Sequence, residues 1–282
     1  MKILVTGATG QLGSDIMLQL ETCSDLIDYL GVGSAQCDIS SRTEVFDLLT
    51  ATQPDIVIHC AAFTQVDRCE TEVDKAYLIN ALGTHHIVEA AEYTKARVVY
   101  ISTDYVFDGT LNRAYNEFDT ANPLSVYGKS KYGGEKSLRP QDLAVRISWV
   151  CGLNGANMVK TVLRLALEHE TLQFVDDQIG SPTFTFDAAK VILKCALDGV
   201  CGTVHLTNSG VTSWCGFAKK IFSLTGRDPE RIIPITTEQL VPKRPAPRPK
   251  NSVLDNMVLR LYGFEPLPHW EQSLEKMIKE LQ

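Results

Sequence analysis

The chain has 282 residues, of which 44% are hydrophobic, and its formal net charge is -7. A chain of this length and composition can bury a full core, as one two-lobed unit or as two closely associated domains, so we do not expect disorder. The negative charge, without a basic arm or stripe, removes the attraction on which non-specific nucleic-acid binding depends. No apolar run approaches the roughly 20 residues that cross a bilayer, and the start of the chain lacks a signal-peptide core. We therefore expect a cytoplasmic protein with neither a nucleic-acid nor a membrane partner.

Eight cysteines are present, but they include no C-x-x-C pair, and no secretory context accompanies them. The sequence therefore predicts neither disulfide bonds nor a zinc site. Cys60 stands inside an apolar run and is expected to act as a small buried hydrophobic residue.

Short apolar runs alternate with longer helical patterns in the first half of the chain, which is typical of a parallel sheet covered on both faces. Ser41 and Glu44 form the pattern of a capping box that opens a helix through Ala51, and Pro54 follows the end of that helix. The longest helical pattern covers residues 72–93. Strands are predicted at residues 2–6, 28–33, 55–60, 97–102 and 143–148.

The alternation loosens after Trp149, which indicates a smaller lobe that faces the substrate. Residues 241–250 contain four prolines, which remove backbone donors, so we expect an irregular loop there. Helices are predicted near residues 158–169, 186–197, 213–225 and 270–281, and a strand near residues 203–207.

The fold class that follows is α/β: a Rossmann-like, doubly wound parallel sheet with a smaller C-terminal substrate-binding lobe. Residues 1–150 are expected to form the dinucleotide-binding Rossmann domain. Residues 151–282 are expected to form mainly the substrate-binding lobe, with a part of roughly 175–210 returning to the Rossmann core.

Three glycines directly follow the first predicted strand, with the spacing G-x-x-G-x-x-G. Gly7 permits a tight turn, Gly10 lets the backbone approach a pyrophosphate, and Gly13 allows the next helix to pack closely on the strand. The phosphates would lie at the positive N-terminus of that helix, whose apolar positions include Leu12 and Ile16. The pattern predicts a dinucleotide site, and a glycine turn without a ligand is the alternative.

Residues 31–34 occupy the position where an acidic residue would hold the ribose 2′-hydroxyl of NAD(H). They carry neither an acid nor an arginine. Because the missing acid favours NADP(H) and the missing base leaves NAD(H) open, NADPH is the predicted cofactor and NADH the alternative. The small residues Cys60, Ala61 and Ala62 would let the nicotinamide half pass close to the backbone, with tight packing as the alternative.

Tyr127 and Lys131 stand four residues apart, so a helix would present both side chains on one face. Ser102 and Thr103 come at the end of a predicted strand, where open parallel sheets bind ligands. Reduction of a ketone needs a hydride from nicotinamide and a proton for the developing alkoxide, which Tyr127 would donate. Lys131 would lower the pKa of the phenol and hold the cofactor ribose, while Thr103 and Ser102 would bind the carbonyl oxygen. The alternative is a surface helix pair without a role.

Five longer segments carry recognisable motifs, including Ser-Thr-Asp-Tyr-Val-Phe-Asp-Gly at residues 102–109 and Asp-Gln-Ile-Gly-Ser-Pro-Thr at residues 177–183. The others occupy residues 122–128, 146–149 and 248–252. Together they resemble the dTDP-4-dehydrorhamnose reductases, a family of the extended short-chain dehydrogenase/reductase superfamily. The resemblance implies NADPH-dependent reduction of the C4 ketone of dTDP-4-dehydro-β-L-rhamnose to dTDP-L-rhamnose in nucleotide-sugar biosynthesis.

With the motif residues above, the resemblance implies two sets of contacts. Asp38 and Asn80 belong to the first set, the contacts with the cofactor. The alternative for Asp38 is a turn residue, and the alternative for Asn80 is an ordinary helix residue. The implied cofactor-binding residues are Gly7, Thr9, Gly10, Gln11, Leu12, Gly13, Asp38, Ile39, Cys60, Ala61, Ala62, Thr64, Asn80, Tyr127 and Lys131. The implied substrate-binding residues are Thr64, Val66, Asp67, Thr103, Tyr127, Trp149 and Arg248.

Two of the substrate residues have a stated role. Trp149 would form an apolar wall, with core packing as the alternative. Arg248 would face the nucleotide diphosphate, because a guanidinium binds phosphate in a bidentate way and a stiff proline-flanked loop loses little entropy. The alternative for Arg248 is a solvated loop charge.

Related proteins differ at identifiable positions. Sugar-nucleotide 4,6-dehydratases carry an Asp-Glu pair after the threonine, whereas Asp104 and Tyr105 follow Thr103 here, so dehydratase chemistry lacks its acid-base partner. A nucleotide-sugar 4-epimerase and a non-catalytic NADP(H)-binding regulatory subunit stay open as alternatives. Some of these reductases dimerise through magnesium, and Asp15 stands where one acidic ligand occurs, but no convincing acidic partner accompanies it near Asp187. No metal is predicted, and a homodimer is left open.

Overall fold

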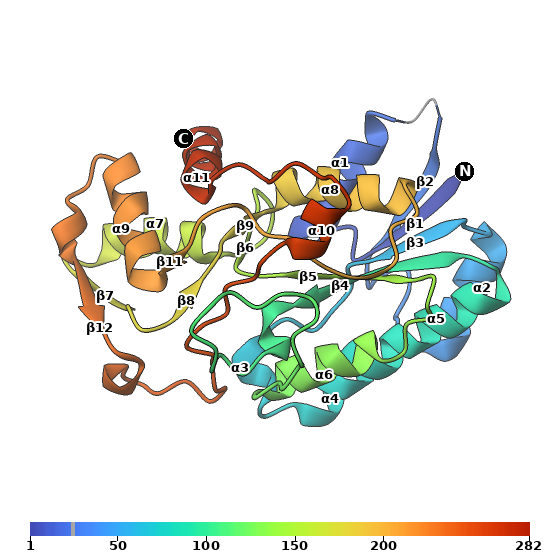
Figure 1. Ribbon diagram of the computed structural model, residues 1–282, viewed down its shortest axis with the longest axis horizontal. Helices are drawn as coiled ribbons and strands as arrows, with labels where there is room; N and C mark the ends of the chain where they lie inside the picture. The colour runs from blue at the N-terminus through green and yellow to red at the C-terminus, as the bar shows by residue number, and fades with distance from the viewer. Residues whose placement is uncertain (24–25) are drawn as a thin grey trace.

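The larger lobe is built on a parallel sheet whose strands run side by side through its centre (Figure 1). The computed structural model describes residues 1–23 and 26–282. In this part of the chain the main sheet has six strands, in the order β10-β5-β4-β3-β1-β2. The strand order changes direction between β1 and β3, which is where open α/β sheets form a ligand crevice. The strands are β1 (Lys2–Thr6), β2 (Asp28–Val32), β3 (Ile56–His59), β4 (Arg97–Thr103), β5 (Leu143–Ile147) and β10 (Gly202–His205).

The five strands predicted in the first half are all present, and β1 begins and ends at the predicted residues. Every residue of β3 and β5 is buried, because helices cover both faces of the sheet. The strand predicted near residues 203–207 is β10, which extends the sheet beyond β5 in parallel. The α/β fold class is therefore confirmed.

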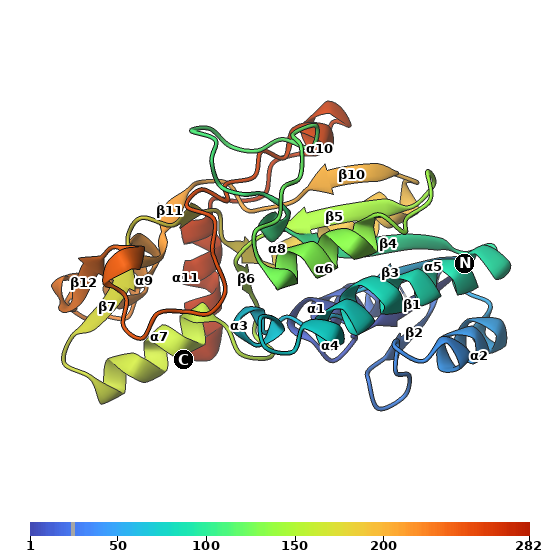
Figure 2. The ribbon, with the colours of Figure 1, turned by 90° about the horizontal axis from the view of Figure 1, so that it is seen from below.

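Helices cover the two faces of this sheet in separate layers (Figures 1 and 2). One layer contains α1 (Gln11–Glu21) and α8 (Thr185–Leu197), and the other contains α2 (Arg42–Thr52), α5 (Thr84–Tyr93) and α6 (Val126–Glu135).

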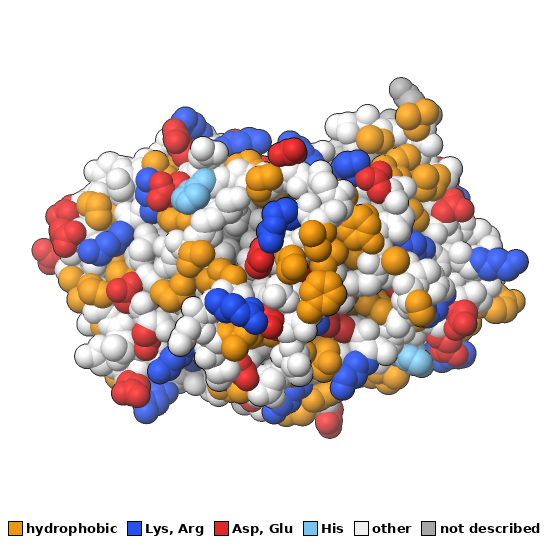
Figure 3. All heavy atoms as spheres, viewed as in Figure 1, with side chains coloured by type: hydrophobic (Ala, Val, Ile, Leu, Met, Phe, Trp, Pro, Cys, Tyr) orange, Lys and Arg blue, Asp and Glu red, His pale blue; other side chains and the backbone are white. Residues whose placement is uncertain are grey.

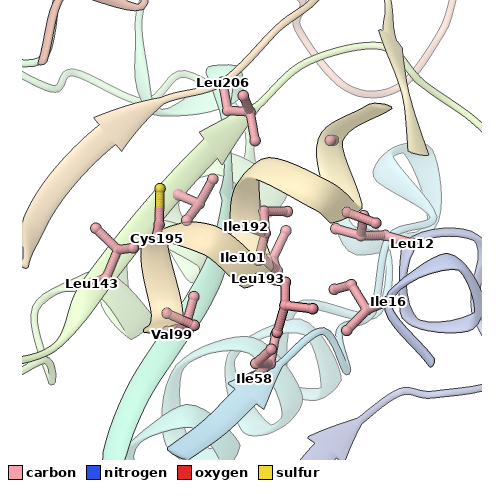
Figure 4. Packing of buried hydrophobic residues seen from close by; sticks show 14 of the residues in the cluster. Leu12, Ile16, Ile58, Val99, Ile101, Leu143, Ile192, Leu193, Cys195 and Leu206 are labelled. Atoms are coloured by element: carbon pink, nitrogen blue, oxygen red, sulfur yellow. The ribbon is translucent and has the colours of Figure 1, made fainter. Parts of the chain in front are cut away.

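The first layer buries a continuous apolar cluster against the sheet (Figure 4). Leu12 and Ile16 of α1 meet Ile192 and Leu193 of α8 above sheet residues such as Ile58. These apolar positions recur at the spacing of one helix face, which is why α1 and α8 lie flat on the sheet. Because α8 and β10 come late in the chain, residues from both halves complete the larger lobe.

The helix predicted over residues 72–93 is interrupted by a π-helical segment. α4 (Val73–Tyr77) is followed by η1 (Leu78–Gly83) and then by α5. Apolar periodicity does not reveal an inserted residue, so the sequence predicted one uninterrupted helix. Such π-helical turns are rare and frequently lie at functional sites, and this one carries Asn80.

The predicted capping box is half formed. Ser41 caps α2 by accepting a hydrogen bond from the Glu44 backbone N–H at 3.4 Å. The Glu44 carboxylate instead accepts from the Asp38 backbone N–H at 2.9 Å, so it fixes the turn that precedes the helix. The helix ends at Thr52, before Pro54, as predicted.

The smaller lobe has a core of its own, in which Phe217, Phe222 and Trp270 are buried. Its three longer helices lie within a residue or two of the predicted ranges: α7 (Met158–Glu168), α9 (Trp214–Leu224) and α11 (Trp270–Leu281). Residues 241–250 form neither a helix nor a strand, as their prolines predict.

The short elements of this lobe and of the connections were not predicted, because a run of two to five residues is too short to show a hydrophobic periodicity. The missed strands are β6 (Val150–Cys151), β7 (Leu172–Val175), β8 (Ile179–Gly180), β9 (Thr183–Phe184), β11 (Thr212–Ser213) and β12 (Ile232–Ile235). The missed helices are α3 (Val66–Cys69), α10 (Met257–Leu261) and the 3-10 turns η2 (Asp104–Val106), η3 (Pro229–Arg231) and η4 (Thr237–Gln239).

Among residues 1–23 and 26–282, no helix combines the length and the apolar character that crossing a membrane requires. The boundary between the lobes at residue 150 stays a prediction.

Candidate active site

The turn between β1 and α1 brings its glycines against neighbouring backbone. Gly7 has a φ of +66°, and a Cβ there would lie 2.7 Å from the Ala61 backbone nitrogen. A Cβ on Gly13 would lie 2.2 Å from the Gly7 carbonyl oxygen, so α1 can pack on the turn only with glycine at this position. Gly10 is exposed, and its nearest contact would be the Gly7 oxygen at 3.2 Å. The structure thus gives Gly7 and Gly13 packing roles and leaves the Gly10 backbone accessible.

The N-terminus of α1 is suited to an anion. Its N-cap is Gly10, which has no side chain to cap the helix, and the first-turn residues are uncharged. Uncapped backbone N–H groups at a helix N-terminus bind phosphate readily, helped by the helix dipole. Thr9 is exposed beside this turn, while Leu12 is buried beneath it. The turn therefore fits the pyrophosphate of a dinucleotide.

The end of β2 presents uncharged residues to the same edge of the sheet. Gly33 and Ser34 follow the strand, and a Cβ on Gly33 would lie 3.3 Å from the Thr9 hydroxyl oxygen. A ribose 2′-phosphate would meet no carboxylate on these two residues, which fits NADP(H) better than NAD(H).

Asp38 and Ile39 have partners within the protein. The Asp38 carboxylate accepts hydrogen bonds from the Ser40 backbone N–H at 2.9 Å and the Ser40 hydroxyl at 2.8 Å, the pattern of a turn residue. Ile39 is buried and packs against Gly83, where a Cβ would lie 3.1 Å from its side chain. Their contact with the cofactor stays a prediction.

Gln11 connects the glycine turn to the smaller lobe. Its side-chain oxygen accepts hydrogen bonds from the Gly152 backbone N–H at 3.1 Å and from the Asn157 side-chain amide at 3.0 Å. The contact of Gln11 with the cofactor stays a prediction.

The segment after β3 carries small or exposed side chains along the carboxyl edge of the sheet. Cys60, Ala61 and Ala62 are partly buried, and Thr64 is exposed. Burial raises the pKa of the Cys60 thiol to about 12, so this residue is neutral, in line with the expected small hydrophobic character.

Asn80, on the π-helical segment, holds this same stretch of backbone in place. Its side-chain oxygen accepts from the Phe63 N–H at 2.7 Å, and its amide donates to the Phe63 carbonyl at 3.1 Å and to the Ser130 hydroxyl at 3.0 Å. Asn80 therefore ties the segment after β3 to α6. Its predicted contact with the cofactor stays a prediction, because these bonds engage its amide with protein groups.

Tyr127 and Lys131 lie one turn apart on α6, and their exposed fractions are only 9% and 3%. Lys131 Nζ donates to the Ile101 carbonyl at 2.7 Å and lies 4.1 Å from the centre of the Tyr100 ring, so it reaches down to β4. The Tyr127 ring meets the Tyr105 ring edge-on, with 5.5 Å between the ring centres. The alternative of a surface helix pair is wrong, because both side chains are buried against the end of β4.

Thr103 joins Tyr127 at this edge, and Ser102 faces elsewhere. Burial raises the pKa of Tyr127, and the nearby Thr103 side chain acts to lower it. The Ser102 hydroxyl instead donates to Glu135 Oε1 at 2.5 Å, beneath α6. Successive side chains of a strand point to opposite faces, which explains the separation. The predicted contact of Ser102 with the carbonyl oxygen stays a prediction.

Asp104 is a residue of this site to which the sequence analysis gave no role. Asp104 is 2% exposed, and burial raises the pKa of its carboxyl to about 6, while the Ser252 and Thr103 side chains act to lower it. The Thr103 hydroxyl donates to Asp104 Oδ1 at 3.0 Å. An acid directly after the threonine was a visible signal, but sequence cannot show that its side chain is buried there.

Asp67 and Arg248, both predicted to contact the substrate, contact each other. Arg248 Nη1 and Nη2 donate to the two Asp67 carboxylate oxygens at 3.0 and 2.9 Å. Burial acts to raise the pKa of Asp67, but the Arg248 guanidinium outweighs it and holds that pKa low. The Arg248 side chain is 11% exposed, so the alternative of a solvated loop charge is wrong. Its contact with the nucleotide diphosphate stays a prediction.

Arg244, in the same loop, is a residue that the sequence analysis missed. Its guanidinium lies 4.0 Å from Asp67, and 57% of its side chain is exposed. The signal was the concentration of basic residues among the prolines of residues 241–250. Thr64 lies on the stretch that leads into α3, and Val66 is the first residue of that helix, which also carries Asp67.

Trp149 is inserted between two parts of the smaller lobe. Its indole stacks on Trp214 with 3.5 Å between ring centres and an interplanar angle of 6°. A Cβ on Gly180 would lie 2.5 to 2.8 Å from three adjacent atoms of the same ring, so the backbone of Gly180 packs against it. Trp149 itself is only partly buried, so core packing stays the alternative. The role of Trp149 as a wall of the substrate site stays a prediction.

A separate cavity of about 370 Å³ lies on another part of the surface. Figure 3 shows hydrophobic side chains gathered near the middle of the face on which α10 lies in Figure 1. The cavity is lined there by Leu259, Phe264 and Leu267, with Asp255 and Arg260 beside them. Its lining comes from the segments around α10 and after β10, so it is distinct from the site at Tyr127 and Lys131.

A doubly wound sheet with a glycine turn after β1 and a buried Tyr-Lys pair beside the end of β4 defines the class of extended short-chain dehydrogenases/reductases. The chain belongs to the family described as the RmlD substrate binding domain, whose model matches residues 1–282.

The chain is similar to solved structures and to other known proteins over its full length. The chain is 44% identical to a dTDP-4-dehydrorhamnose reductase from Clostridium acetobutylicum, with 100% of both chains covered and a TM-score of 0.95. It is 40% identical to a dTDP-4-dehydrorhamnose reductase from Bacillus anthracis in complex with NADP, with 99% of both chains covered and a TM-score of 0.93. It is also 39% identical to the spore coat polysaccharide biosynthesis protein SpsK of Bacillus subtilis, covering 99% of this chain and 97% of that protein.

Proposed function

We propose that this protein is an NADPH-dependent reductase that converts the C4 ketone of dTDP-4-dehydro-β-L-rhamnose to the alcohol of dTDP-L-rhamnose. The observation that carries the proposal is the buried cluster of Thr103, Tyr127 and Lys131 at the carboxyl end of β4. The full-length similarity to reductases of this name, one of them in complex with NADP, supports the substrate and the cofactor.

The residues around the glycine turn fit the cofactor. The uncapped N-terminus of α1 would bind the pyrophosphate, and the uncharged end of β2 at Gly33 would leave space for a 2′-phosphate. When bound, NADPH supplies the hydride that C4 receives. Thr9, Ala61 and Ala62 border the same edge of the sheet and would contact the dinucleotide.

Tyr127 donates the proton that the developing alkoxide requires. Burial raises the pKa of Tyr127 above its usual value, which keeps the phenol protonated at neutral pH but makes it a weaker acid, so proton donation requires that the phenolate be stabilised. The Lys131 ammonium, one turn along α6, stabilises the phenolate that remains. The Thr103 hydroxyl, which donates to Asp104 in the structure, would turn to donate its one proton to the carbonyl oxygen as negative charge builds there.

The decisive experiment follows NADPH absorbance with and without a dTDP-4-keto-6-deoxyhexose. The reductase consumes NADPH only when the keto sugar is present, and NMR of the product identifies the configuration at C4. Tight NADPH binding without turnover on any keto sugar would support the regulatory subunit instead. Interconversion of C4 epimers without net NADPH consumption would support the epimerase.

The proposed role has a consequence for where the protein works. An enzyme that uses a nucleotide sugar and NADPH works where both are made, so we place it in the cytoplasm. A homodimer stays a prediction, which light scattering after size-exclusion chromatography tests.

A further inference from the structure

A buried ion pair begins one helical turn after Lys131 on α6. Glu135, one turn further along α6, accepts hydrogen bonds from Arg146 Nε at 2.9 Å and from Arg146 Nη2 at 2.7 Å. Both side chains are only 7% exposed. The Ser102 hydroxyl donates to the same carboxylate, and Ser102 and Arg146 are direct partners in the pairing of β4 with β5. The carboxylate of Glu135 therefore fastens the end of α6 to two strands of the sheet.

Helix α6, which ends at Glu135, has little intrinsic stability. Three of its ten residues are glycine, each of which costs up to about 1 kcal/mol relative to alanine in a helix. Close packing requires two of them: a Cβ on Gly128 would lie 2.2 Å from the Tyr105 carbonyl oxygen, and one on Gly134 would lie 2.6 Å from the Asn80 carbonyl oxygen. Tertiary contacts must therefore set the position of α6.

Glu135 is also an unfavourable choice for the helix itself. A carboxylate in the last turn opposes the helix dipole, which favours cations there. Burying a carboxylate and a guanidinium together also costs desolvation that their attraction only partly recovers. Helix stability therefore does not account for an acid at this position, and a role toward a neighbouring group does.

The neighbouring group is the Lys131 ammonium. Burial lowers the pKa of Lys131 to about 7, and the Glu135 carboxylate acts to raise it. Four groups that face Lys131 are uncharged at neutral pH, because burial lowers the pKa of His59 to about 3 and raises the pKa values of Cys60, Tyr100 and Tyr127. The charged groups are Glu135 and its partner Arg146. The residues packed around Lys131 are His59 and Cys60 from the end of β3, Tyr100 from β4, Tyr127 and Glu135 from α6, and Arg146 from β5 behind Glu135.

We propose that Glu135 is a positioning residue that keeps the Lys131 side chain charged and holds α6 against β4, with Arg146 and Ser102 orienting its carboxylate. The inference rests on the proposed function through the role of Lys131 in the reaction. It assigns Ser102 to the support of the lysine in place of contact with the substrate.

A purely structural ion pair is the competing explanation, and a double variant separates the two. Replacing Glu135 alone leaves the Arg146 guanidinium buried without its partner, which destabilises the fold whichever explanation holds. The double variant Glu135→Gln/Arg146→Gln removes both charges and retains side chains that can hydrogen-bond to each other and to Ser102. The matched control is Arg164→Gln/Glu168→Gln, an exposed pair on α7 in the smaller lobe.

The first readout needs no cofactor. Lysines labelled with ¹³C at Cε are titrated by NMR in the ligand-free protein, and Lys131→Arg assigns the signal of interest. In the Glu135/Arg146 double variant we expect the titration midpoint of Lys131 to fall by up to about one pH unit, because the lost carboxylate acted on Lys131 and the Arg146 guanidinium behind it opposed that effect only in part. The control variant should keep the wild-type midpoint. A folded double variant with an unchanged midpoint would overturn the proposal.

The second readout is the pH dependence of kcat with NADPH and the keto sugar. The decline of kcat at high pH should move to lower pH in the double variant by the same amount as the NMR midpoint. A uniform loss of kcat at every pH, with the decline unmoved, would assign the pair a structural role alone. If the wild-type protein shows no turnover, the proposed function fails, and the NMR titration still decides whether Glu135 controls the charge of Lys131.

Discussion

The guanidinium of Arg248 and the carboxylate of Asp67 form a bidentate pair between residues that lie 181 positions apart in the chain. The Ala246 backbone N–H also donates to Asp67, at 3.3 Å. The proline-rich loop 241–250 is thereby fastened to α3 beside the candidate active site. The pair orders the loop before a substrate arrives, which reduces the entropy that binding costs.

Arg248→Ala should weaken binding of the sugar nucleotide more than binding of NADPH. The variant releases the loop and removes a cation beside the substrate site, so we expect KM for the keto sugar to rise roughly 10-fold or more, the effect of about 1.4 kcal/mol. Steady-state KM values and a fluorescence titration with NADPH measure the two effects. Arg244→Ala, in the same loop but mostly exposed, is the companion variant. A larger loss of NADPH affinity than of substrate affinity would reassign the loop to the cofactor.

Tyr127→Phe should abolish turnover and leave NADPH affinity nearly intact. The substitution removes the proton donor but keeps the ring that packs against Tyr105, so the fold should change little. General acid catalysis typically contributes 10²- to 10⁴-fold, and we expect kcat to fall by roughly that factor. Thermal unfolding and NADPH binding serve as controls. Activity equal to that of the wild type would remove Tyr127 from its assigned role.

Gly10→Ala and Gly13→Ala should fail in different ways. At Gly13 a Cβ would collide with the Gly7 carbonyl oxygen at 2.2 Å, so we expect a less stable protein. At Gly10 the nearest atom would lie 3.2 Å away, so the protein should fold while the methyl group obstructs an approaching pyrophosphate. Urea unfolding compares the stabilities, and NADPH titration compares the affinities. Wild-type NADPH affinity in Gly10→Ala would argue against a phosphate at this turn.

Asp104→Asn should make the protein more stable at neutral pH. Burial raises the pKa of Asp104 to about 6 in the folded state, whereas the unfolded chain ionises near its usual value of 3.8. Between these two values the Asp104 carboxyl ionises in the unfolded chain but stays protonated in the folded protein. Ionisation therefore favours the unfolded chain, and the wild type loses stability as the pH rises from about 4 to 6. The upper limit of this loss is about 3 kcal/mol.

Urea unfolding of wild type and Asp104→Asn at pH 4 and at pH 7.5 measures this effect. The stability difference should be small at pH 4 and should favour the variant at pH 7.5. Because Asp104 accepts a hydrogen bond from Thr103, kcat should fall in the same variant. An equal stability difference at both pH values would show that the carboxyl ionises as readily in the folded protein as in the unfolded chain.

The main sheet and its helices could be predicted because their apolar residues recur with regular spacing. β1, β3 and β5 are buried on both faces and read as continuous apolar runs, and α1 has one apolar face. The shared helix face of Tyr127 and Lys131 was predictable for the same reason, since four residues correspond to about one helical turn.

Contacts between distant residues were not predictable from one sequence. The pairing of Arg248 with Asp67, the stacking of Trp149 on Trp214, and the pairing of Glu135 with Arg146 depend on how the lobes and strands come together. The π-helical segment at Asn80 was missed because a single extra residue scarcely alters the apolar periodicity over residues 72–93.

The position of β10 beside β5 has a consequence for how the protein is made. A nascent chain that has emerged only as far as residue 150 lacks both this edge strand and α8, the helix that shields α1 and one face of the sheet. Such a fragment exposes apolar surface to water and to other chains. The nucleotide-binding lobe therefore reaches its mature form only after roughly three-quarters of the polypeptide has been synthesised, and truncation between the lobes should yield an aggregating product in place of an independent domain.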